Sequence, residues 1–321
     1  MIMLSTWSSA ARPLRRVLWI TALGFVAVCW LSSRAQAQVD SPVTKINAAA
    51  ATAEITVQPL RGNVNAVMGS GGNITVLTSD DGKLMVDTGI VLSRARLSAA
   101  LESVSKGPPR YAVNTHWHWD HTSGNEWIHQ AGATIIAHEN TLKHLSTTIR
   151  VGDWQYTFDP LPKGGLPTLI VSSELALRFG DETVLVKSYP SAHTDGDLYV
   201  YFTKADILAT GDTYWNGLYP FIDKVVGGGI NGMIEAANVN LAVATDQTIV
   251  VPGHGPVSDR AGLIDYRDML VHIRDNVAAL KRQGKSLEEI IAAKPSAAYD
   301  AKWGGFVINP AFFTRLVYQS L

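Results

Sequence analysis

The chain carries a set of histidines and aspartates whose spacing is typical of metal ligands. They occur in four short segments: His-Trp-His-Trp-Asp-His at 116–121, Ala-His-Thr-Asp-Gly-Asp at 192–197, Thr-Gly-Asp-Thr at 210–213 and Pro-Gly-His-Gly at 252–255. The candidate ligands are His116, His118, Asp120, His121, His193, Asp212 and His254. Five imidazoles and two carboxylates are the ligand inventory of a hydrolytic site with two metal ions.

The segment at 116–121 is the most specific of the four. Its spacing lets His116 and His118 turn toward one metal ion, while Asp120 and His121 face a second. A single histidine is more often a satisfied core or surface residue than a ligand, and the alternative for the segment is a chance polar run at a strand end. Four ligand-type residues in six positions, together with the three distal segments, favour the metal site. Taken alone, Asp212 also suits a simple turn.

Each ligand segment follows a predicted strand. Short β-branched runs between turn signals predict an antiparallel meander at 55–60, 64–68, 74–78 and 83–87, then strands at 111–115 and 134–137. A second strand series is predicted at 168–171, 175–179, 183–189, 198–202, 207–209 and 248–251, with helices at 92–105, 124–131, 139–147, 232–244 and 263–283. The stretch 151–167 is predicted as a functional or mobile loop. Two strand series, each followed by helices, predict an α+β fold of two mixed sheets packed face to face.

The N-terminal 37 residues have the composition of a cleavable signal peptide. A basic start precedes an apolar run of about 15 residues at 17–31, and Ala35-Gln-Ala37 is a small-residue cleavage site. A membrane anchor is the alternative, but it needs roughly 20 residues to span a bilayer. The pair Arg15-Arg16 leaves Sec and twin-arginine export open. We therefore expect an exported protein, periplasmic or secreted, with residues 38–53 as a flexible lead-in, 54–260 as the core domain and 261–321 as a helical segment packed on it.

Charge and cysteine content exclude several classes of site and partner. Cys29 is the only cysteine and lies in the predicted leader, so the mature chain would have no thiolate ligand and no disulfide. Without residues 1–37 the net charge is −5, from 23 Lys and Arg against 28 Asp and Glu. Nothing indicates a nucleic-acid partner, which would need a basic face. A small-molecule substrate is expected, and the oligomeric state stays open.

The motif set resembles the metallo-β-lactamase superfamily of metal-dependent hydrolases. The match runs from Asn63 to Gly255, and Val86-Asp87-Thr88-Gly89 fits the upstream Asp-Thr-Gly element of that family. The resemblance implies a four-layer αββα sandwich and two Zn²⁺ ions. It implies that His116, His118 and His193 hold one ion, that Asp120, His121 and His254 hold the other, and that Asp212 bridges them. Asp87 would be a supporting residue, or simply a turn after a strand.

Departures from the family pattern narrow the expected branch. Because it has no cysteine ligand, the metal-ligand set resembles that of the glyoxalase II and lactonase branches and that of the cysteine-free lactamase subclass. Those lactamases generally lack the bridging aspartate, so Asp212 counts against a β-lactamase proper without excluding it.

The expected reaction is hydrolysis of a carbonyl-type bond in a lactam, lactone, ester or thioester. Two Zn²⁺ ions sharing a water would lower its pKa from 15.7 toward about 7, and Asp120 would orient the resulting hydroxide as the catalytic carboxylate. One alternative is a single-iron oxygenase of the same fold, against which the retained His121 and His254 argue. Another is a non-catalytic periplasmic metal-binding protein.

Aromatic side chains near the ligand segments are candidates for a substrate pocket. Trp119, Trp215 and Tyr219 are the predicted substrate-binding residues, although each also suits the core. No basic cluster resembles an anion clamp, which favours a neutral or cyclic substrate over a glutathione thioester. The C-terminal aromatics, including Trp303 and Phe306, are expected in the core, with self-association as the alternative.

Overall fold

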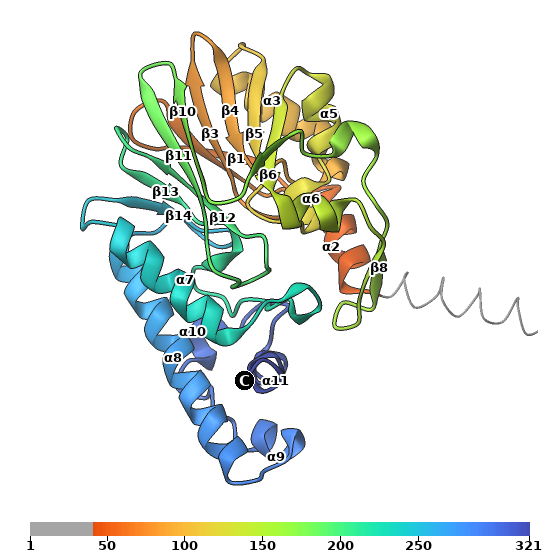
Figure 1. Ribbon diagram of the computed structural model, residues 1–321, viewed down its shortest axis with the longest axis vertical. Helices are drawn as coiled ribbons and strands as arrows, with labels where there is room; N and C mark the ends of the chain where they lie inside the picture. Colours follow the sequence, from red (N-terminus) through yellow and green to blue (C-terminus); the bar gives the residue numbers. More distant parts are fainter. Residues whose placement is uncertain (1–40) are drawn as a thin grey trace, which may run out of the picture.

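Two β-sheets packed face to face form the centre of the computed structural model, which describes residues 41–321 (Figure 1). The predicted signal peptide lies outside the described residues. In spatial order the first sheet contains β1 (Thr56–Pro59), β2 (Val64–Met68), β3 (Ile74–Ser79), β4 (Gly82–Val86), β5 (Pro109–Val113), β6 (Thr134–His138) and β9 (Leu169–Val171). The second contains β10 (Glu174–Phe179), β11 (Glu182–Ser188), β12 (Leu198–Phe202), β13 (Ile207–Ala209) and β14 (Ile249–Val251).

Both sheets are mixed, as the sequence predicted. Strands β1 to β4 pair antiparallel as a meander, whereas β4, β5, β6 and β9 are parallel. In the second sheet only the β13–β14 pair is parallel. β5 runs parallel to β4 and β6, and β13 runs parallel to β14. The carboxyl ends of these strands lie at the open edge of the sandwich, and the loops with the candidate ligands follow them.

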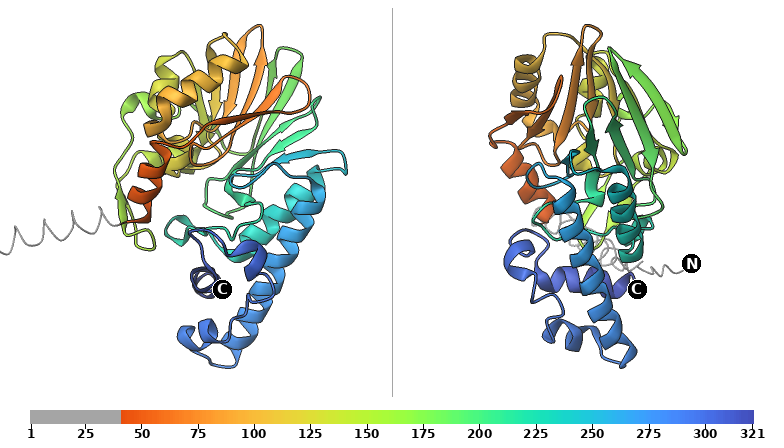
Figure 2. Two further views of the ribbon diagram at one scale, coloured as in Figure 1. Left: turned by 180° about the vertical axis from the view of Figure 1, so that it is seen from behind. Right: turned by 90° about the vertical axis from the view of Figure 1, so that its left-hand side faces the viewer.

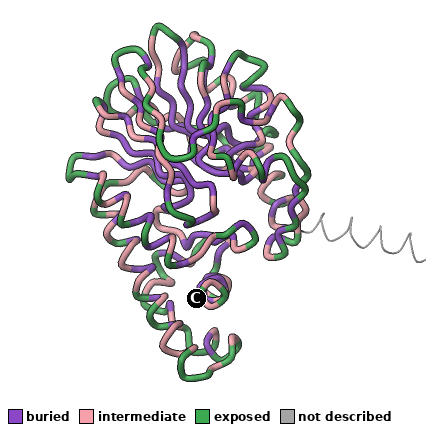
Figure 3. Tube along the Cα trace, viewed as in Figure 1, coloured by how far each residue is buried: buried purple, intermediate pink, exposed green. Residues whose placement is uncertain are grey.

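Side-chain alternation explains why the first sheet is covered on both faces. In β4, Leu84 and Val86 pack between the two sheets, while Met85 packs on the opposite face against Leu97 of α3 (Arg94–Val104). Successive side chains of a strand point to opposite faces, so a fully apolar strand needs two apolar neighbours. The side view in Figure 2 shows the two sheets as separate layers, and the buried parts of the chain concentrate in them (Figure 3).

Helices form the outer layers of an αββα sandwich. Those on the first sheet are α3 and α5 (Asn125–Gln130), whereas α7 (Ile230–Val243) and α8 (Arg260–Arg282) pack on each other and cover the second sheet. The remaining helices are α2 (Pro42–Ala50), α4 (Trp119–Thr122), α6 (Glu139–Leu145), α9 (Leu287–Ala292), α10 (Asp300–Trp303), α11 (Pro310–Gln319) and the 3-10 turns η1 (Val91–Ser93), η2 (Lys163–Gly165), η3 (Gly211–Thr213) and η4 (Lys224–Val226). None of the described helices is long and apolar enough to cross a membrane.

Two local predictions differ from the structure. The segment predicted to open the second strand series is β9, which pairs with β6 and closes the first sheet instead. The predicted loop at 151–167 overlaps a small hairpin of β7 (Ile149–Val151) and β8 (Tyr156–Phe158), of which only β8 lies wholly within the predicted range. A short apolar strand carries no signal for the sheet it will join, because its partner comes from a distant part of the chain.

The predicted flexible lead-in at 38–53 contains the helix α2 (Pro42–Ala50). The Ser41 side chain accepts a hydrogen bond from the amide of Val43, and Pro42 occupies the first turn, so α2 has a well-formed N-terminus. Val43 is fully buried in the main core. At the other end of α2, Arg96 donates hydrogen bonds to the carbonyls of Ala50 and Ala53, at 2.7 and 2.8 Å. These tertiary contacts, rather than helix propensity, order this segment.

Candidate metal centre

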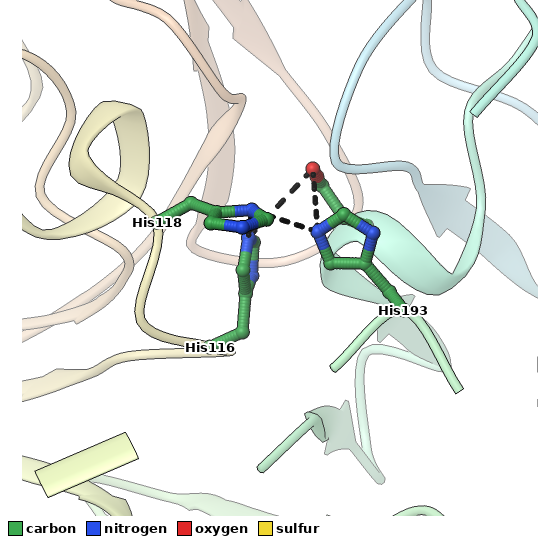
Figure 4. Close-up of side chains that lie close together, drawn as sticks. His116, His118 and His193 are labelled. Carbon is green, nitrogen blue, oxygen red and sulfur yellow. Dashed lines mark hydrogen bonds and ion pairs between the residues drawn. The ribbon is translucent and has the colours of Figure 1, made fainter. Parts of the chain in front are cut away.

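All seven predicted ligands converge at the open edge of the sandwich. One group consists of His116, His118, His193 and Asp212, and the other of Asp120, His121 and His254. Within each group one ligand atom per residue lies within 4.8 Å of the others, which is compatible with a shared metal ion. Figure 4 shows the three imidazoles of the first group pointing at a common centre. The structure therefore assembles the ligand set that the sequence predicted.

Short nitrogen–nitrogen distances define the first group. His118 Nδ1 lies 3.1 Å from His116 Nε2 and 2.8 Å from His193 Nε2. Three imidazole nitrogens at such separations are close to the spacing of ligands around one tetrahedral ion. His118 thus offers Nδ1, whereas the other two histidines offer Nε2.

Asp212 joins the two groups. Its Oδ2 is 3.7 Å from His116 Nε2 and 3.5 Å from His193 Nε2, while its Oδ1 is 3.1 Å from His121 Nε2. His254 Nε2 lies 3.4 Å from Asp212 Oδ2. The carboxylate is 3% exposed, and Oδ1 has no hydrogen-bond partner of good geometry. A buried carboxylate oxygen in this state fits a cation as its missing partner.

Asp120 completes the second group from the rim of the site. Its Oδ2 lies 3.3 Å from His254 Nε2 and 3.7 Å from His121 Nε2. The two imidazole nitrogens of this group are 3.4 Å apart. Asp120 and His254 are the most accessible of the seven side chains, at 10% and 12%, so this half of the site faces the adjoining cavity.

Asp87 holds His121 in place, which supports its predicted role beside the site. Its Oδ2 lies 2.8 Å from His121 Nδ1, and the same carboxylate accepts the backbone amide and the hydroxyl of Thr115 at 2.8 Å. Asp87 has a φ of +66°, an uncommon conformation for a residue with a side chain. Fixing the outer ring nitrogen orients the inner one toward the metal position.

Two further acceptors orient histidines of the first group and were not predicted. Asp223 is fully buried, and its Oδ2 lies 3.0 Å from His118 Nε2. The carbonyl of Phe221 lies 2.8 Å from His193 Nδ1. Asp223 is the one carboxylate in the largely apolar segment 219–226, and this is its only signal in the sequence. A backbone carbonyl, such as that of Phe221, has no sequence signal.

Glycine is required where the backbone approaches the ligands. A Cβ on Gly72 would overlap the ring of His121, and one on Gly253 would overlap Asp212 Oδ1 and the backbone of Gly211. The Gly-His-Gly motif therefore brings the backbone beside the Asp212 carboxylate as well as supplying His254.

Burial and mutual interaction set the charge of the first group. Burial lowers the pKa of His116 well below its usual value and that of His193 to about 4, so both rings are neutral at pH 7. Burial alone would raise the pKa of Asp212, but His121 and the neighbouring imidazoles outweigh it and hold that pKa well below its usual range. Neutral imidazoles and an ionised carboxylate are the forms that bind a metal ion.

An apolar cavity opens onto the two groups. Besides the ligands it is lined by Ile46, Gly71, Trp119, Trp154, Trp215, Phe221, Phe306 and Val307. Trp119 and Trp215 therefore lie where the sequence predicted, and Trp215 packs on His254 with ring centroids 4.2 Å apart. Ile46, Phe221, Phe306 and Val307 come from segments without a ligand motif, and the sequence did not predict them as part of a pocket wall.

Tyr219 is a core residue, and its predicted role in substrate binding is wrong. Its side chain is fully buried, stacks on Phe313 and donates to Asp300 Oδ1 at 2.8 Å. It does not line the metal cavity. Its nearness in sequence to the ligand segments suggested a place in the pocket wall. Phe221, two residues later, does line the cavity, whereas the Tyr219 side chain lies in the core.

Comparison with known proteins identifies the family. Residues 67–277 match the metallo-beta-lactamase superfamily, a range that includes all seven ligands. The chain belongs to the metallo-β-lactamase superfamily. No curated protein sequence matches it significantly.

Solved structures of superfamily members share the fold. The sec-alkylsulfatase Pisa1 from Pseudomonas sp. is 17% identical, with a TM-score of 0.62 over 83% of this chain and 50% of that chain. The BLEG-1 B3 metallo-β-lactamase is 20% identical, with a TM-score of 0.55 over 67% of this chain and 99% of that one. A metallo-β-lactamase from Pontibacter korlensis is 19% identical, with a TM-score of 0.53 over 67% and 98%. This chain thus spans about half the length of the alkylsulfatase, and the likeness concerns fold alone.

Asp223→Asn should weaken metal binding by about 10- to 100-fold, the usual effect of losing a carboxylate that supports a metal-bound histidine. The amide keeps the shape but removes the charge that polarises His118 through Nε2. Competition with a chromophoric chelator measures the affinity. Asp195→Asn is the matched control, because it alters a similar pair at 2.6 Å with His144, which is not a ligand. Equal affinities for wild type and Asp223→Asn would contradict this role.

Metal uptake at pH 6 should release the protons carried by His121 and His254. Burial opposes charge on His254, but Asp212 and Asp120 outweigh it and raise the pKa to about 9, and the same balance raises the pKa of His121 well above its usual value. Both rings are therefore protonated in the metal-free site until the pH rises through these values, and a metal ion displaces those protons. Calorimetric titration in buffers of different ionisation enthalpy counts them. Uptake without proton release would show that the rings are already neutral.

Proposed function

We propose that this member of the metallo-β-lactamase superfamily is a hydrolase that uses two Zn²⁺ ions. The observation that carries the proposal is the pair of buried ligand groups joined by Asp212. Neighbouring acceptors orient three of the imidazoles, those of His118, His121 and His193. An oxygenase site with one iron would not need the second group. A merely structural zinc site would be closed, whereas this one adjoins a cavity.

The residues that would hold the metal ions follow from the two groups. His116, His118 and His193 would bind one ion, and Asp120, His121 and His254 the other, with Asp212 between them. When bound, such an ion pair supplies Lewis-acid polarisation of a substrate oxygen and a water of lowered pKa.

The chain's own contribution is orientation and proton transfer. Asp120 Oδ2 lies at the cavity side of the second group. There it is placed to accept a proton from a water molecule and to direct the lone pair of the water oxygen toward the substrate. Trp119, Trp154 and Phe221 form apolar walls that exclude bulk water, which strengthens electrostatic interactions in the site. No serine or cysteine nucleophile is needed.

The preferred substrate is a neutral carbonyl compound: a lactam, lactone, ester or thioester. Apart from the ligands, every described residue that lines the metal cavity is uncharged. An anionic substrate would need cationic anchors there, whereas a carbonyl can be recognised through its oxygen alone.

Sulfate-ester hydrolysis is a second candidate. The alkylsulfatase likeness extends over 83% of this chain, against 67% or 68% for the lactamases, so it includes more of the structure outside the ligand segments. The same site could activate water for attack on either type of ester. The absence of a cationic anchor among the lining residues makes the carbonyl reaction the first choice.

One set of measurements tests the proposal. Metal analysis of the purified protein should give two zinc ions per chain. The zinc-loaded protein should hydrolyse at least one of nitrocefin, a homoserine lactone, a thioester, a 4-nitrophenyl ester and a secondary alkyl sulfate. Full metal loading without turnover of any of these would favour a metal-binding protein, and iron with oxygen uptake would favour an oxygenase.

We also propose that the protein is exported, on the basis of the composition of residues 1–37. Expression of the full chain in a Gram-negative host and N-terminal sequencing of the periplasmic product should give a start at Gln38. A product retained in the cytoplasm with Met1 intact would contradict it.

A further inference from the structure

An apolar groove continues from the metal cavity along α2. It has a volume of about 580 Å³, against about 70 Å³ for the metal cavity itself. The two share Ile46, Gly71, Phe306 and Val307, so they adjoin each other. The room at the metal centre suits only the reacting group of a substrate, and the adjoining groove offers space for the rest.

The groove is built from one face of α2 and a loop near the C-terminus. Its α2 side is lined by Pro42, Lys45, Ile46, Ala49, Ala50 and Ala53. These positions follow the i, i+3, i+4, i+7 spacing of a single helix face. The opposite side is formed by Phe306, which is 46% exposed, and Val307. In Figure 1, α2 and the helices that flank this loop, α10 and α11, lie at the same open end of the sandwich.

A hydrogen bond joins α2, which forms one side of the groove, to the segment 116–121 that carries four candidate ligands. Trp119, which stands between two metal ligands in sequence, donates its indole N–H to Asn47 Oδ1 of α2 at 3.0 Å. Arg96 holds the carbonyls at the end of the same helix. Because α2 is held at these points, the groove exists before a ligand binds, and ligand binding does not have to order it.

The chemistry of the lining selects an apolar occupant. Lys45 is the only ionisable side chain among the described residues that line the groove, and it is exposed. A monomer that leaves such a continuous apolar surface open beside a reactive site usually uses it for binding.

We propose that the substrate of this site carries an extended alkyl or acyl chain, which lies in the α2 groove while its scissile group lies at the metal centre. The proposal deepens the hydrolase function and rests on it. Each methylene buried in the groove adds up to about fourfold in affinity, so a longer chain is bound more tightly until the groove is filled.

The test compares 4-nitrophenyl acetate with 4-nitrophenyl octanoate on the zinc-loaded protein. The kcat/KM for octanoate should exceed that for acetate by at least about tenfold. Ala49→Trp, which places an indole in the groove far from the ligands, should reduce this ratio at least tenfold. Ala48→Trp is the matched control, since Ala48 is an exposed neighbour on α2 outside the groove, and it should keep the wild-type ratio.

A binding measurement separates the groove from the hydrolase proposal. Metal-free wild type should bind 1-octanol at least about tenfold more tightly than 1-butanol by calorimetry, and Ala49→Trp should abolish this preference. Selective binding of 1-octanol without hydrolysis of either ester, or of nitrocefin, a homoserine lactone, a thioester or a secondary alkyl sulfate, would support the groove and reject the hydrolase. Hydrolysis with equal kcat/KM for both esters would support the hydrolase and overturn the groove. A wild-type dimer that Ala49→Trp dissociates without changing the ester ratio would assign the groove to a second copy of the chain, and also overturns the proposal.

Discussion

Asp212→Asn is expected to lower the hydrolytic kcat/KM by at least about 100-fold and to leave fewer than two zinc ions per chain. The carboxylate lies within 3.1 to 3.7 Å of four imidazole nitrogens, which belong to His116, His121, His193 and His254. An amide keeps the volume but removes the negative charge that can be shared between two cations, and it presents an N–H group to one of the ligand positions. Losing even a residue that only supports a metal ligand costs 10- to 100-fold, so losing a carboxylate that would be a ligand itself should cost at least the upper end of that range.

Metal analysis and steady-state kinetics on the same preparation check this prediction. Asp246→Asn is the matched control, because its side chain is 90% exposed and distant from the ligand groups. It should retain both ions and wild-type turnover. An Asp212→Asn protein with two zinc ions and full activity would show that the two groups are held independently, and the proposed dinuclear site would have to be abandoned.

Trp303→Ala is expected to lower the free energy of unfolding by about 3–5 kcal/mol, the typical cost of truncating a buried tryptophan. Trp303 is 2% exposed and lies in the same core cluster as Tyr266 of α8, with ring centroids 5.8 Å apart. Its backbone carbonyl also accepts the amide of Tyr219. The segment beyond the matched residues 67–277 is thus part of the main core, and a cavity there weakens the layer that covers the second sheet.

Urea denaturation followed by far-UV circular dichroism measures the change. Phe306→Ala is a suitable control from the same segment, because a side chain that is 46% exposed should change stability by no more than about 0.5 kcal/mol. An equal loss in the free energy of unfolding for both variants would contradict the difference in burial between Trp303 and Phe306.

Local sequence was sufficient to predict which candidate ligands come together. His116, His118, Asp120 and His121 lie within six residues on one loop, so their proximity follows from chain connectivity alone. The distal ligands could be predicted because each follows a short apolar strand, and strand ends in such sheets meet at one edge. The mixed sheets and outer helices were likewise predictable, since hydrophobic periodicity is a local property that the burial pattern of each element must satisfy.

Features that depend on distant partners could not be read in the same way. The strand β9 joins the first sheet because β6 offers a free edge, and α2 is ordered because Trp119 and Arg96 bind it. Asp223 lies 105 positions from the histidine that it orients. Tyr219 was placed in the pocket by its nearness in sequence, while the fold placed it in the core.

The sequence by itself therefore determined the fold class and pointed to the cluster of candidate metal ligands, and the tertiary structure decided what surrounds that cluster. The reason is physical. A metal site needs a few strongly interacting atoms that a short motif can supply, whereas a pocket wall needs only apolar volume, which many residue types at many positions can provide. Ile46, Phe221 and Phe306 are ordinary hydrophobic residues in the sequence, and only packing brings them to one cavity.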